Sequence, residues 1–186
     1  GVMTVPSDGS VTTAKLGDSS VTSAKIANDA VTKDKLSAHN YPAFEAYLNS
    51  GFNVVSGANT KVPLDLITFD TNSCYDNSTN YRFTPTVSGK YYVYGITTIY
   101  SGSTSRVEIN RAGIYKNGTA TLSAQNDYRA NNIRTSSSNV SGIIDMNGTT
   151  DYIELYTYTQ STAGTPQLLG QATYKRTLCG AYRIGD

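Results

Sequence analysis

The sequence has little charge, a single histidine, no tryptophan and no long apolar run. Charged residues make up 16% of the 186 residues, and 15 Lys and Arg against 14 Asp and Glu leave a net charge of +1. Soluble chains carry about 25% charged residues, so Ser, Thr, Asn and Tyr must supply much of the polar surface. A balanced charge gives no electrostatic reason to bind nucleic acid or an anionic membrane. Without an apolar run of about 18 residues, no segment is expected to span a bilayer.

The scarcity of cysteine and histidine excludes several kinds of site. Cys74 and Cys179 are too few for a zinc site or a disulfide scaffold. They are either two buried thiols or one disulfide between an early strand and the last one, and the sequence leaves both open. His39 fits a solvated or interface residue better than a catalytic base. Since GxSxG, HExxH, P-loop and GxGxxG motifs are absent as well, we expect no enzyme, no catalytic residue and no cofactor.

Three acidic residues are the candidates for a metal site. Asp145 and Asp151 flank Asn147-Gly148, and Glu154 follows them. Such acids can bind calcium, but more often they only keep a turn solvated. The sequence therefore favours no metal here and leaves a calcium site open.

Residues 7 to 36 contain a ten-residue unit three times: SDGSVTTAKL, GDSSVTSAKI and ANDAVTKDKL. Aligning the units places their large apolar residues in two columns, Val11, Val21 and Val31 in one and Leu16, Ile26 and Leu36 in the other. Two such residues in ten are too few for one unit to bury itself. The segment is either a disordered linker or, as the constant spacing favours, a shaft in which several copies of the chain bury the two columns together.

The repeat length also predicts the local conformation of this segment. Ten residues match neither the 3.6-residue period of a helix nor a heptad. We therefore expect short turns, each capped by a Ser or Thr, in place of a continuous helix. Residues 1–40 are predicted to form a shaft or anchor segment and residues 41–186 a separate head.

The predicted head is rich in β-branched and aromatic residues, including all 15 tyrosines. Strand-like stretches such as KYYVYGITTIYS (90–101) and DYIELYTYT (151–159) are separated by turn residues at short spacing. Asn117-Gly118 and Asn147-Gly148 are strong signals for tight hairpins. This pattern predicts an all-β sandwich or barrel.

Both faces of these two stretches are apolar or aromatic. Because side chains alternate along a strand, Tyr91 and Val93 share one face of the first stretch, and Ile153 and Leu155 share one face of the second. The tyrosines predicted on the opposite faces are Tyr92, Tyr94, Tyr152, Tyr156 and Tyr158. A face in water would show polar alternation, so we predict that these tyrosines contact a neighbouring copy. The alternative is that they lie on a solvent-exposed face.

The spacing of aromatic residues and glycine in the head resembles the complement C1q-like and TNF-like jelly-roll family. The residues that carry the resemblance are Phe83, Gly89, Tyr91 and Val93, with Asp70 and Tyr75 upstream, PAFEAYL (42–48) as the opening strand and LCGAYRI (178–184) as the final one. The gap from Tyr75 to Phe83 is one residue longer than usual, and Val93 stands where Phe is common. The resemblance implies two antiparallel sheets and a homotrimer.

The repeat unit is similar to D-G-S-V-T-x-x-K-L repeats that precede globular tips in bacteriophage fibre and other virion proteins. The combination implies a homotrimeric fibre protein on the surface of a virion, on its tail or capsid. The head would attach to a bacterial surface glycan or protein, and the N-terminal segment would contact other virion proteins. Two alternatives are a capsid-bound head fibre or decoration protein anchored by the repeats, and a secreted C1q/TNF-like ligand or lectin.

One loop of the head offers candidate receptor-binding residues. Tyr128, Arg129 and Arg134 lie in the stretch 126–139, where Tyr, Asn, Ser and Arg form the kind of adaptable surface that recognises other molecules. These three side chains could stack on a sugar or hydrogen-bond to it. Three sites on each trimer would raise avidity. The alternative is that the loop only contributes solubility.

Overall fold

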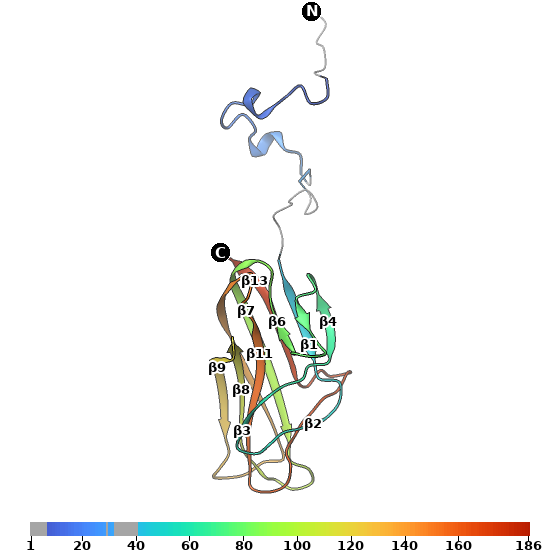
Figure 1. Ribbon diagram of the computed structural model, residues 1–186, viewed down its shortest axis with the longest axis vertical. Helices are drawn as coiled ribbons and strands as arrows, with labels where there is room; N and C mark the ends of the chain where they lie inside the picture. Colours follow the sequence, from blue (N-terminus) through green and yellow to red (C-terminus); the bar gives the residue numbers. More distant parts are fainter. Residues whose placement is uncertain (1–6, 29, 32–40) are drawn as a thin grey trace, which may run out of the picture. The chain divides into compact units, whose positions relative to one another are not determined.

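The structure is a computed structural model that describes residues 7–28, 30–31 and 41–186, and it divides the chain into two units, Gly1–Asn40 and Tyr41–Asp186 (Figure 1). The second unit, which we call the head, consists of antiparallel strands in two sheets. Among the described residues, no helix is long and apolar enough to cross a membrane.

Sheet A contains seven of the described strands, and its long strands follow the order β4-β1-β13-β7-β10. Their bounds are β1 Ala43–Tyr47, β4 Leu66–Asp70, β7 Ser88–Tyr100, β10 Thr135–Asn147 and β13 Leu178–Gly185, with the short β2 Phe52–Asn53 and β12 Gln167–Leu168 beside the end of β7.

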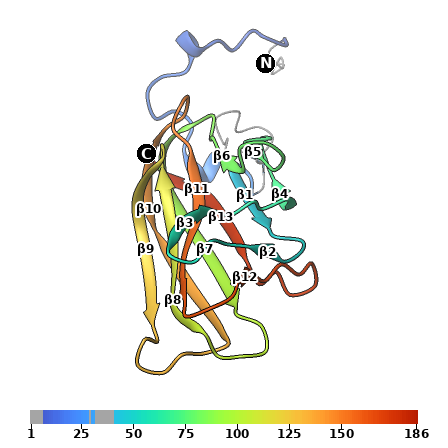
Figure 2. The same ribbon diagram turned by 60° about the horizontal axis from the view of Figure 1, so that its bottom comes forward.

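Sheet B contains six of the described strands, in the order β5-β6-β11-β8-β9 with β3 also paired to β11. Their bounds are β3 Ala58–Lys61, β5 Tyr75–Asp76, β6 Arg82–Phe83, β8 Val107–Lys116, β9 Thr119–Asp127 and β11 Ile153–Ser161. Figures 1 and 2 show the two sheets packed against each other in the head. The prediction of an all-β jelly-roll sandwich is confirmed.

The core lies between the sheets and contains a row of aromatic rings. Phe44 of β1 stacks on Tyr75 and on Phe83, with ring centroids 4.7 and 4.5 Å apart, and Tyr91 meets the edge of Phe83 at 5.9 Å. Tyr91 and Val93 are fully buried, so the predicted inward face of β7 is confirmed. Such stacked and edge-to-face pairs add to the stabilisation that burial of their apolar area supplies.

Both cysteines belong to this core and are free thiols. Cys74 and Cys179 are buried, so of the two alternatives left open by the sequence, the structure has the pair of thiols. Burial raises the pKa of Cys179 to about 12. Since the thiolate is the reactive form of cysteine, neither position suits redox or nucleophilic chemistry.

The two Asn-Gly pairs have different roles. Asn117 and Gly118 join β8 to β9, and their φ angles of 52° and 77° are both positive, as a type I′ hairpin requires. The prediction of a hairpin at Asn147-Gly148 is wrong, because β10 belongs to sheet A and β11 to sheet B. The side chain of Asn147 accepts hydrogen bonds from three successive backbone N–H groups, those of Thr149, Thr150 and Asp151, and so turns the chain from one sheet to the other.

The N-terminal unit repeats one local conformation twice within its described residues. Single 3-10 turns span Thr13–Lys15 and Ser23–Lys25, which confirms the expectation of short turns. The expected caps are wrong, since neither Thr12 nor Thr22 makes a side-chain cap hydrogen bond. Instead, a lysine side chain forms a hydrogen bond back to the backbone just before each turn. Nζ of Lys15 donates to the Ser10 carbonyl, and Nζ of Lys25 donates to the Ser20 carbonyl, both at 2.6 Å.

The apolar columns of the repeats remain exposed in the single chain. Val11, Val21 and Val31 keep about half of their surface, with exposed fractions of 56%, 55% and 49%. Leu16 and Ile26 are exposed as well. Leu36 and His39 lie outside the described residues. The contact that the sequence predicts for these columns therefore requires something other than this chain alone.

Candidate functional site

The outward face of sheet A carries an apolar patch that we define by Tyr92, Tyr94, Ile143 and Tyr182. Tyr92 is flanked in register by Tyr182 of β13 and Ile143 of β10. Its ring centroid lies 5.5 Å from that of Tyr182 and 6.3 Å from that of Tyr94. Ile143 is 58% exposed and Tyr182 is 47% exposed. The sheet A patch therefore offers contiguous apolar surface on three neighbouring strands.

A neutralised polar cluster borders the sheet A patch. The Tyr94 hydroxyl donates to Glu45 Oε2 at 3.0 Å, and Lys175 Nζ lies 3.1 Å from Glu45 Oε1 and also bonds Thr68. Burial by itself would raise the pKa of Glu45, but the bonds from Lys175, Thr68 and Tyr94 outweigh it and lower that pKa. Burial, with the adjacent Glu45 carboxylate, raises the pKa of Tyr94. At neutral pH the border therefore consists of the ion pair between Glu45 and Lys175, whose charges cancel, and the protonated hydroxyl of Tyr94.

Gly180 of β13 makes the bond between Tyr94 and Glu45 possible. It lies between the two in register, since it pairs with Tyr94 on one side and with Glu45 on the other. A Cβ at this position would lie 2.3 Å from the Cζ atom of Tyr94. The tyrosine ring can therefore cross the strand to reach the carboxylate only because position 180 has no side chain.

The remaining predicted interface tyrosines lie on the other sheet. Tyr156 and Tyr158 are residues of β11 in sheet B, and Tyr152 directly precedes that strand. Each already has a partner within the chain: the Arg82 guanidinium is 4.5 Å from the Tyr152 ring centroid, Arg111 is 4.6 Å from that of Tyr158, and Tyr115 stacks on Tyr156 at 4.0 Å. The five tyrosines therefore divide between two sheets, Tyr92 and Tyr94 in sheet A and the other three at sheet B. That any of them contacts a neighbouring copy stays a prediction.

A hollow of about 240 Å³ lies on the outward face of sheet B. Its lining comes from strands β3, β8, β9 and β11: Asn59, Arg111, Gly113, Tyr115, Ala120, Ser123, Tyr156, Thr157 and Tyr158. We call it the sheet B hollow. The sequence interpretation missed it, although the alternation of Arg111, Gly113 and Tyr115 along β8 is a period-2 signal that places them on one face.

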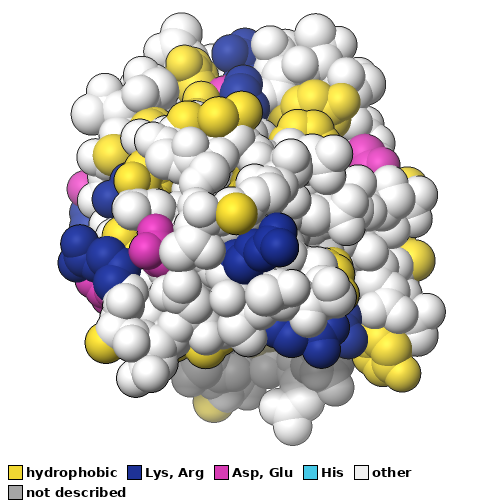
Figure 3. Space-filling view, turned by 90° about the horizontal axis from the view of Figure 1, so that it is seen from below, with side chains coloured by type: hydrophobic (Ala, Val, Ile, Leu, Met, Phe, Trp, Pro, Cys, Tyr) yellow, Lys and Arg dark blue, Asp and Glu magenta, His cyan; other side chains and the backbone are white. Residues whose placement is uncertain are grey.

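The three predicted receptor-binding residues are held by contacts within the head. The Tyr128 hydroxyl accepts a bond from Ser136 at 3.3 Å. Arg129 forms an ion pair with Asp127, which lowers the pKa of that carboxyl, and Arg134 donates to the carbonyl of Gly102 and to the hydroxyl of Tyr100. Figure 3, which views the head from the end where loops join the long strands, shows Lys and Arg side chains in separate spots with no continuous basic surface. Their role in receptor binding stays a prediction.

The three candidate metal-binding acids are each paired with a different lysine. Asp145 pairs with Lys90 at 3.0 Å, Asp151 with Lys116 at 2.8 Å and buried Glu154 with Lys61 at 2.7 Å. Across the described residues, no group of three or more His, Cys, Asp and Glu side chains could hold a metal ion. Asp145 and Glu154 form their ion pairs between paired strands, β10 with β7 and β11 with β3, whereas Asp151 belongs to a network at the turns.

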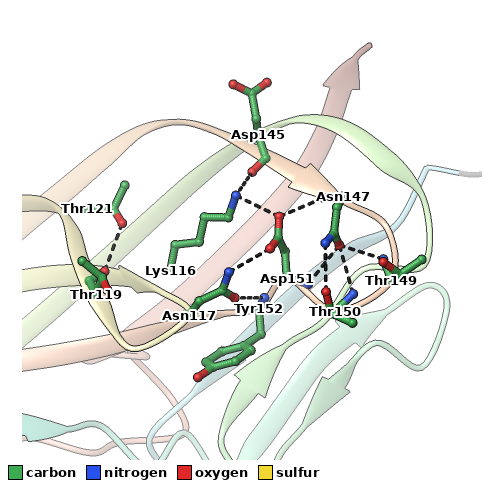
Figure 4. Close-up of polar contacts among 10 residues, drawn as sticks. All are labelled: Lys116, Asn117, Thr119, Thr121, Asp145, Asn147, Thr149, Thr150, Asp151 and Tyr152. Carbon is green, nitrogen blue, oxygen red and sulfur yellow. Dashed lines mark hydrogen bonds and ion pairs between the residues drawn. The ribbon is translucent and has the colours of Figure 1, made fainter.

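Asp151 is the centre of the largest of these turn networks. Figure 4 shows its carboxylate between the two Asn-Gly turns, where it accepts bonds from Lys116 Nζ, from Asn117 Nδ2 at 2.8 Å and from the Asn147 backbone N–H at 3.0 Å. Lys116 also donates to the Asp145 carbonyl. The hydrogen bonds from Lys116 and Asn117 lower the pKa of Asp151. The network joins the β8–β9 hairpin to the crossover between the sheets.

Comparisons with known proteins define the fold of the head but no closer relationship. No family model matches the chain, and no curated protein matches its sequence. Among solved structures, murine APRIL superposes with a TM-score of 0.56 at 9% identity, over 78% of this chain and 100% of the other. Eiger TNF from S. frugiperda superposes with a TM-score of 0.54 at 13% identity, over 78% and 94%. The chain therefore contains a TNF-like jelly roll.

Proposed function

We propose that the protein is a non-enzymatic bacteriophage fibre protein, displayed on the virion, whose TNF-like head forms a homotrimer and attaches to the surface of a bacterial host. The observation that carries the proposal is the unequal exposure of the two sheets. Among the described strands, the exposed large apolar residues all belong to sheet A: Ile67, Phe69, Ile143, Tyr182 and Ile184.

This exposure supports self-association through sheet A. Single exposed apolar residues are common on proteins, but a contiguous apolar patch on a small domain usually contacts a partner. The tyrosines of the sheet A patch suit such a contact, because they bury a large area and keep a polar tip. A trimer that packs this face against its neighbours leaves the outward face of sheet B in contact with solvent.

The N-terminal repeats support the same three-chain assembly. Val11 and Val21, like Leu16 and Ile26, occupy equivalent positions in two units of the same conformation and are exposed in the single chain. If three chains run side by side, each column meets its own copies, because closed symmetry places identical residues around the axis. Such a shaft is also the role that the similarity to fibre repeats implies, and it favours a fibre over a secreted ligand.

Light scattering on the full chain at micromolar concentration tests the trimer. The chain has a mass of 20.0 kDa, so a homotrimer has a mass of about 60 kDa. A measured mass of one chain would contradict the proposal. Immunogold electron microscopy of purified phage particles tests the location: label on tail fibres supports the proposal, label on the capsid supports a head fibre or decoration protein, and unlabelled particles overturn a virion role.

A further inference from the structure

We propose that the sheet B hollow binds one sugar ring that carries an anionic group, so that the trimer would attach to an acidic glycan on the host surface. This inference rests on the proposed function for its biological meaning, while its chemistry rests on the hollow alone. It places recognition on the wall of the head instead of on the loop with Tyr128, Arg129 and Arg134.

One lining position of the hollow, on the outward face of β8, has no side chain. Gly113 lies between Arg111 and Tyr115 along the strand and pairs with Tyr156 of β11 and Ser123 of β9. A Cβ at Gly113 would lie 3.2 Å from the Tyr115 ring. The Tyr115 ring therefore packs closely against Gly113, and both residues line the hollow. Its volume of about 240 Å³ lies below the roughly 300 to 1,000 Å³ of pockets for larger ligands, which suits a single ring.

Aromatic rings form one side of the hollow. The centroids of Tyr115 and Tyr156 lie 4.0 Å apart and their planes are inclined by 23°, so the two rings form a stack. A sugar ring has C–H groups on its faces and hydroxyls around its edge, so it can pack against an aromatic surface while its rim hydrogen-bonds to polar groups. Ser123 and Asn59 line the same hollow and supply such groups. Tyrosine is suited to this role because it loses little conformational entropy on binding.

Arg111 supplies the preference for an anion. Its guanidinium lies 4.6 Å from the Tyr158 ring centroid and donates a hydrogen bond to Asn59 Oδ1 at 3.0 Å. These two contacts fix the position of the guanidinium beside the hollow. In the described part of the chain, no carboxylate lies within ion-pair distance of Arg111, whereas the neighbouring Lys61 is neutralised by Glu154 at 2.7 Å. A positioned guanidinium binds a carboxylate or phosphate through two parallel hydrogen bonds. The free charge therefore points to an acidic sugar.

The arginines of the 126–139 loop already have polar partners that would compete with an anionic ligand. Arg129 is paired with Asp127, and Arg134 is bonded to a backbone carbonyl and a tyrosine hydroxyl. To bind an anionic ligand, Arg129 would first have to release a carboxylate, whereas Arg111 would not. Weak binding at one hollow suffices, because three copies on each trimer raise the avidity for a repeating glycan.

The test is binding of D-glucuronic acid, D-glucose 6-phosphate and D-glucose to the full chain, measured by saturation-transfer NMR and by titration. We expect at least one of the two acidic sugars to bind and D-glucose to bind at least tenfold more weakly. Arg111→Gln should weaken the acidic sugar by about tenfold or more, the loss expected for a charge-assisted hydrogen-bonded pair. Tyr156→Ala should abolish the transfer signal, and Gly113→Ser should do so by filling the hollow.

Tyr152→Ala is the matched control, since Tyr152 has an arginine over its ring but does not line the hollow. It should leave binding unchanged, and thermal unfolding checks that every variant is folded. Equal affinity for D-glucose and the acidic sugars, or full affinity in folded Arg111→Gln, would overturn the proposal. If none of the three sugars binds while the chain is trimeric and labels virions, this inference fails and the proposed function stands. If an acidic sugar binds but the chain is absent from particles, the proposed function fails and the site stands.

Discussion

Single side chains in the head stabilise connections that the strands alone would not hold. Asp151 shows this most clearly, because one carboxylate satisfies a lysine, an asparagine side chain and a backbone N–H at two turns that lie far apart in the sequence. Its side chain is only 13% exposed. Hydrogen bonds to a partly buried charged group stabilise a fold more than those of an exposed ion pair.

Replacement of Asp151 should therefore weaken the head. We expect Asp151→Asn to lower the free energy of unfolding by about 1 to 2 kcal/mol, because Lys116 loses its counter-ion and one acceptor becomes a donor. Urea unfolding of the purified chain measures the change. Asp145→Asn is the control: that side chain is 77% exposed and paired only with Lys90, so its effect should stay below about 0.5 kcal/mol. Equal effects of the two substitutions would contradict the assigned role.

The lowered pKa of Asp151 gives the same residue a pH signature. A carboxyl whose pKa is lower in the folded state than in the unfolded state stabilises the fold above its unfolded pKa, about 3.9 for Asp. That contribution is lost as the pH falls from this value through the folded pKa. The stability difference between the wild-type chain and Asp151→Asn should thus be constant from pH 7 to about pH 5 and shrink below about pH 4. Thermal unfolding midpoints across this range measure it, and a difference independent of pH would contradict the prediction.

Among the strands, β7 determines how closely the two sheets approach. Gly95 lies on its inward side, where a Cβ would be 2.6 Å from the Cδ1 atom of Leu155 and 3.2 Å from that of Ile114. Leu155 and Ile114 both belong to sheet B. A side chain at position 95 would displace the ends of these two side chains, so this glycine allows the close packing of the core here.

Glycine substitutions in two strands test this packing. Gly95→Ala should destabilise the head by about 1 to 3 kcal/mol, the cost of overpacking a filled core. A methyl group at Gly185 of β13 would have no heavy atom of the described residues within 4 Å, so Gly185→Ala should be neutral or slightly stabilising through the unfolded state. Urea unfolding of both variants measures the difference. Equal stabilities would show that the sheets adjust freely around β7.

For the assembled molecule, the unequal exposure of the sheets gives a direct prediction. Ile143→Asp places a charge in the sheet A patch, where Ile143 is 58% exposed in the single chain. The isolated head should tolerate this change, but burial of an unpaired charge at a trimer interface is costly. Light scattering should show a folded monomer or a weakened trimer.

Thr121→Asp provides the comparison on sheet B, since Thr121 is an exposed residue of β9. It should leave the trimer intact. If Thr121→Asp dissociates the trimer and Ile143→Asp does not, the interface lies on sheet B and the sheet B hollow is covered. That result would overturn both the assignment of the interface and the site proposed for an acidic sugar.

Local patterns in the sequence predicted the strand class, the turn at Asn117-Gly118, the short turns of the repeats and the inward face with Tyr91 and Val93. Each of these depends on neighbours a few residues away, through backbone φ preference or side-chain alternation. The wrong hairpin at Asn147-Gly148 has the same local signal, but the strands on its two sides pair with β7 and β8 in different sheets.

Long-range strand pairing decided the rest. It separated Tyr92 and Tyr94 from the tyrosines of β11. It also brought Asn59 of β3 and Tyr156 of β11 to one hollow beside the β8–β9 hairpin, which carries Arg111 and Ser123. The alternation of side chains along a strand predicts that a residue faces away from the core. It does not predict which sheet the residue belongs to or which side chains lie beside it. The exposed apolar face, and an Arg111 that has no carboxylate partner among the described residues, are therefore properties of the folded head, because both depend on which strands become neighbours.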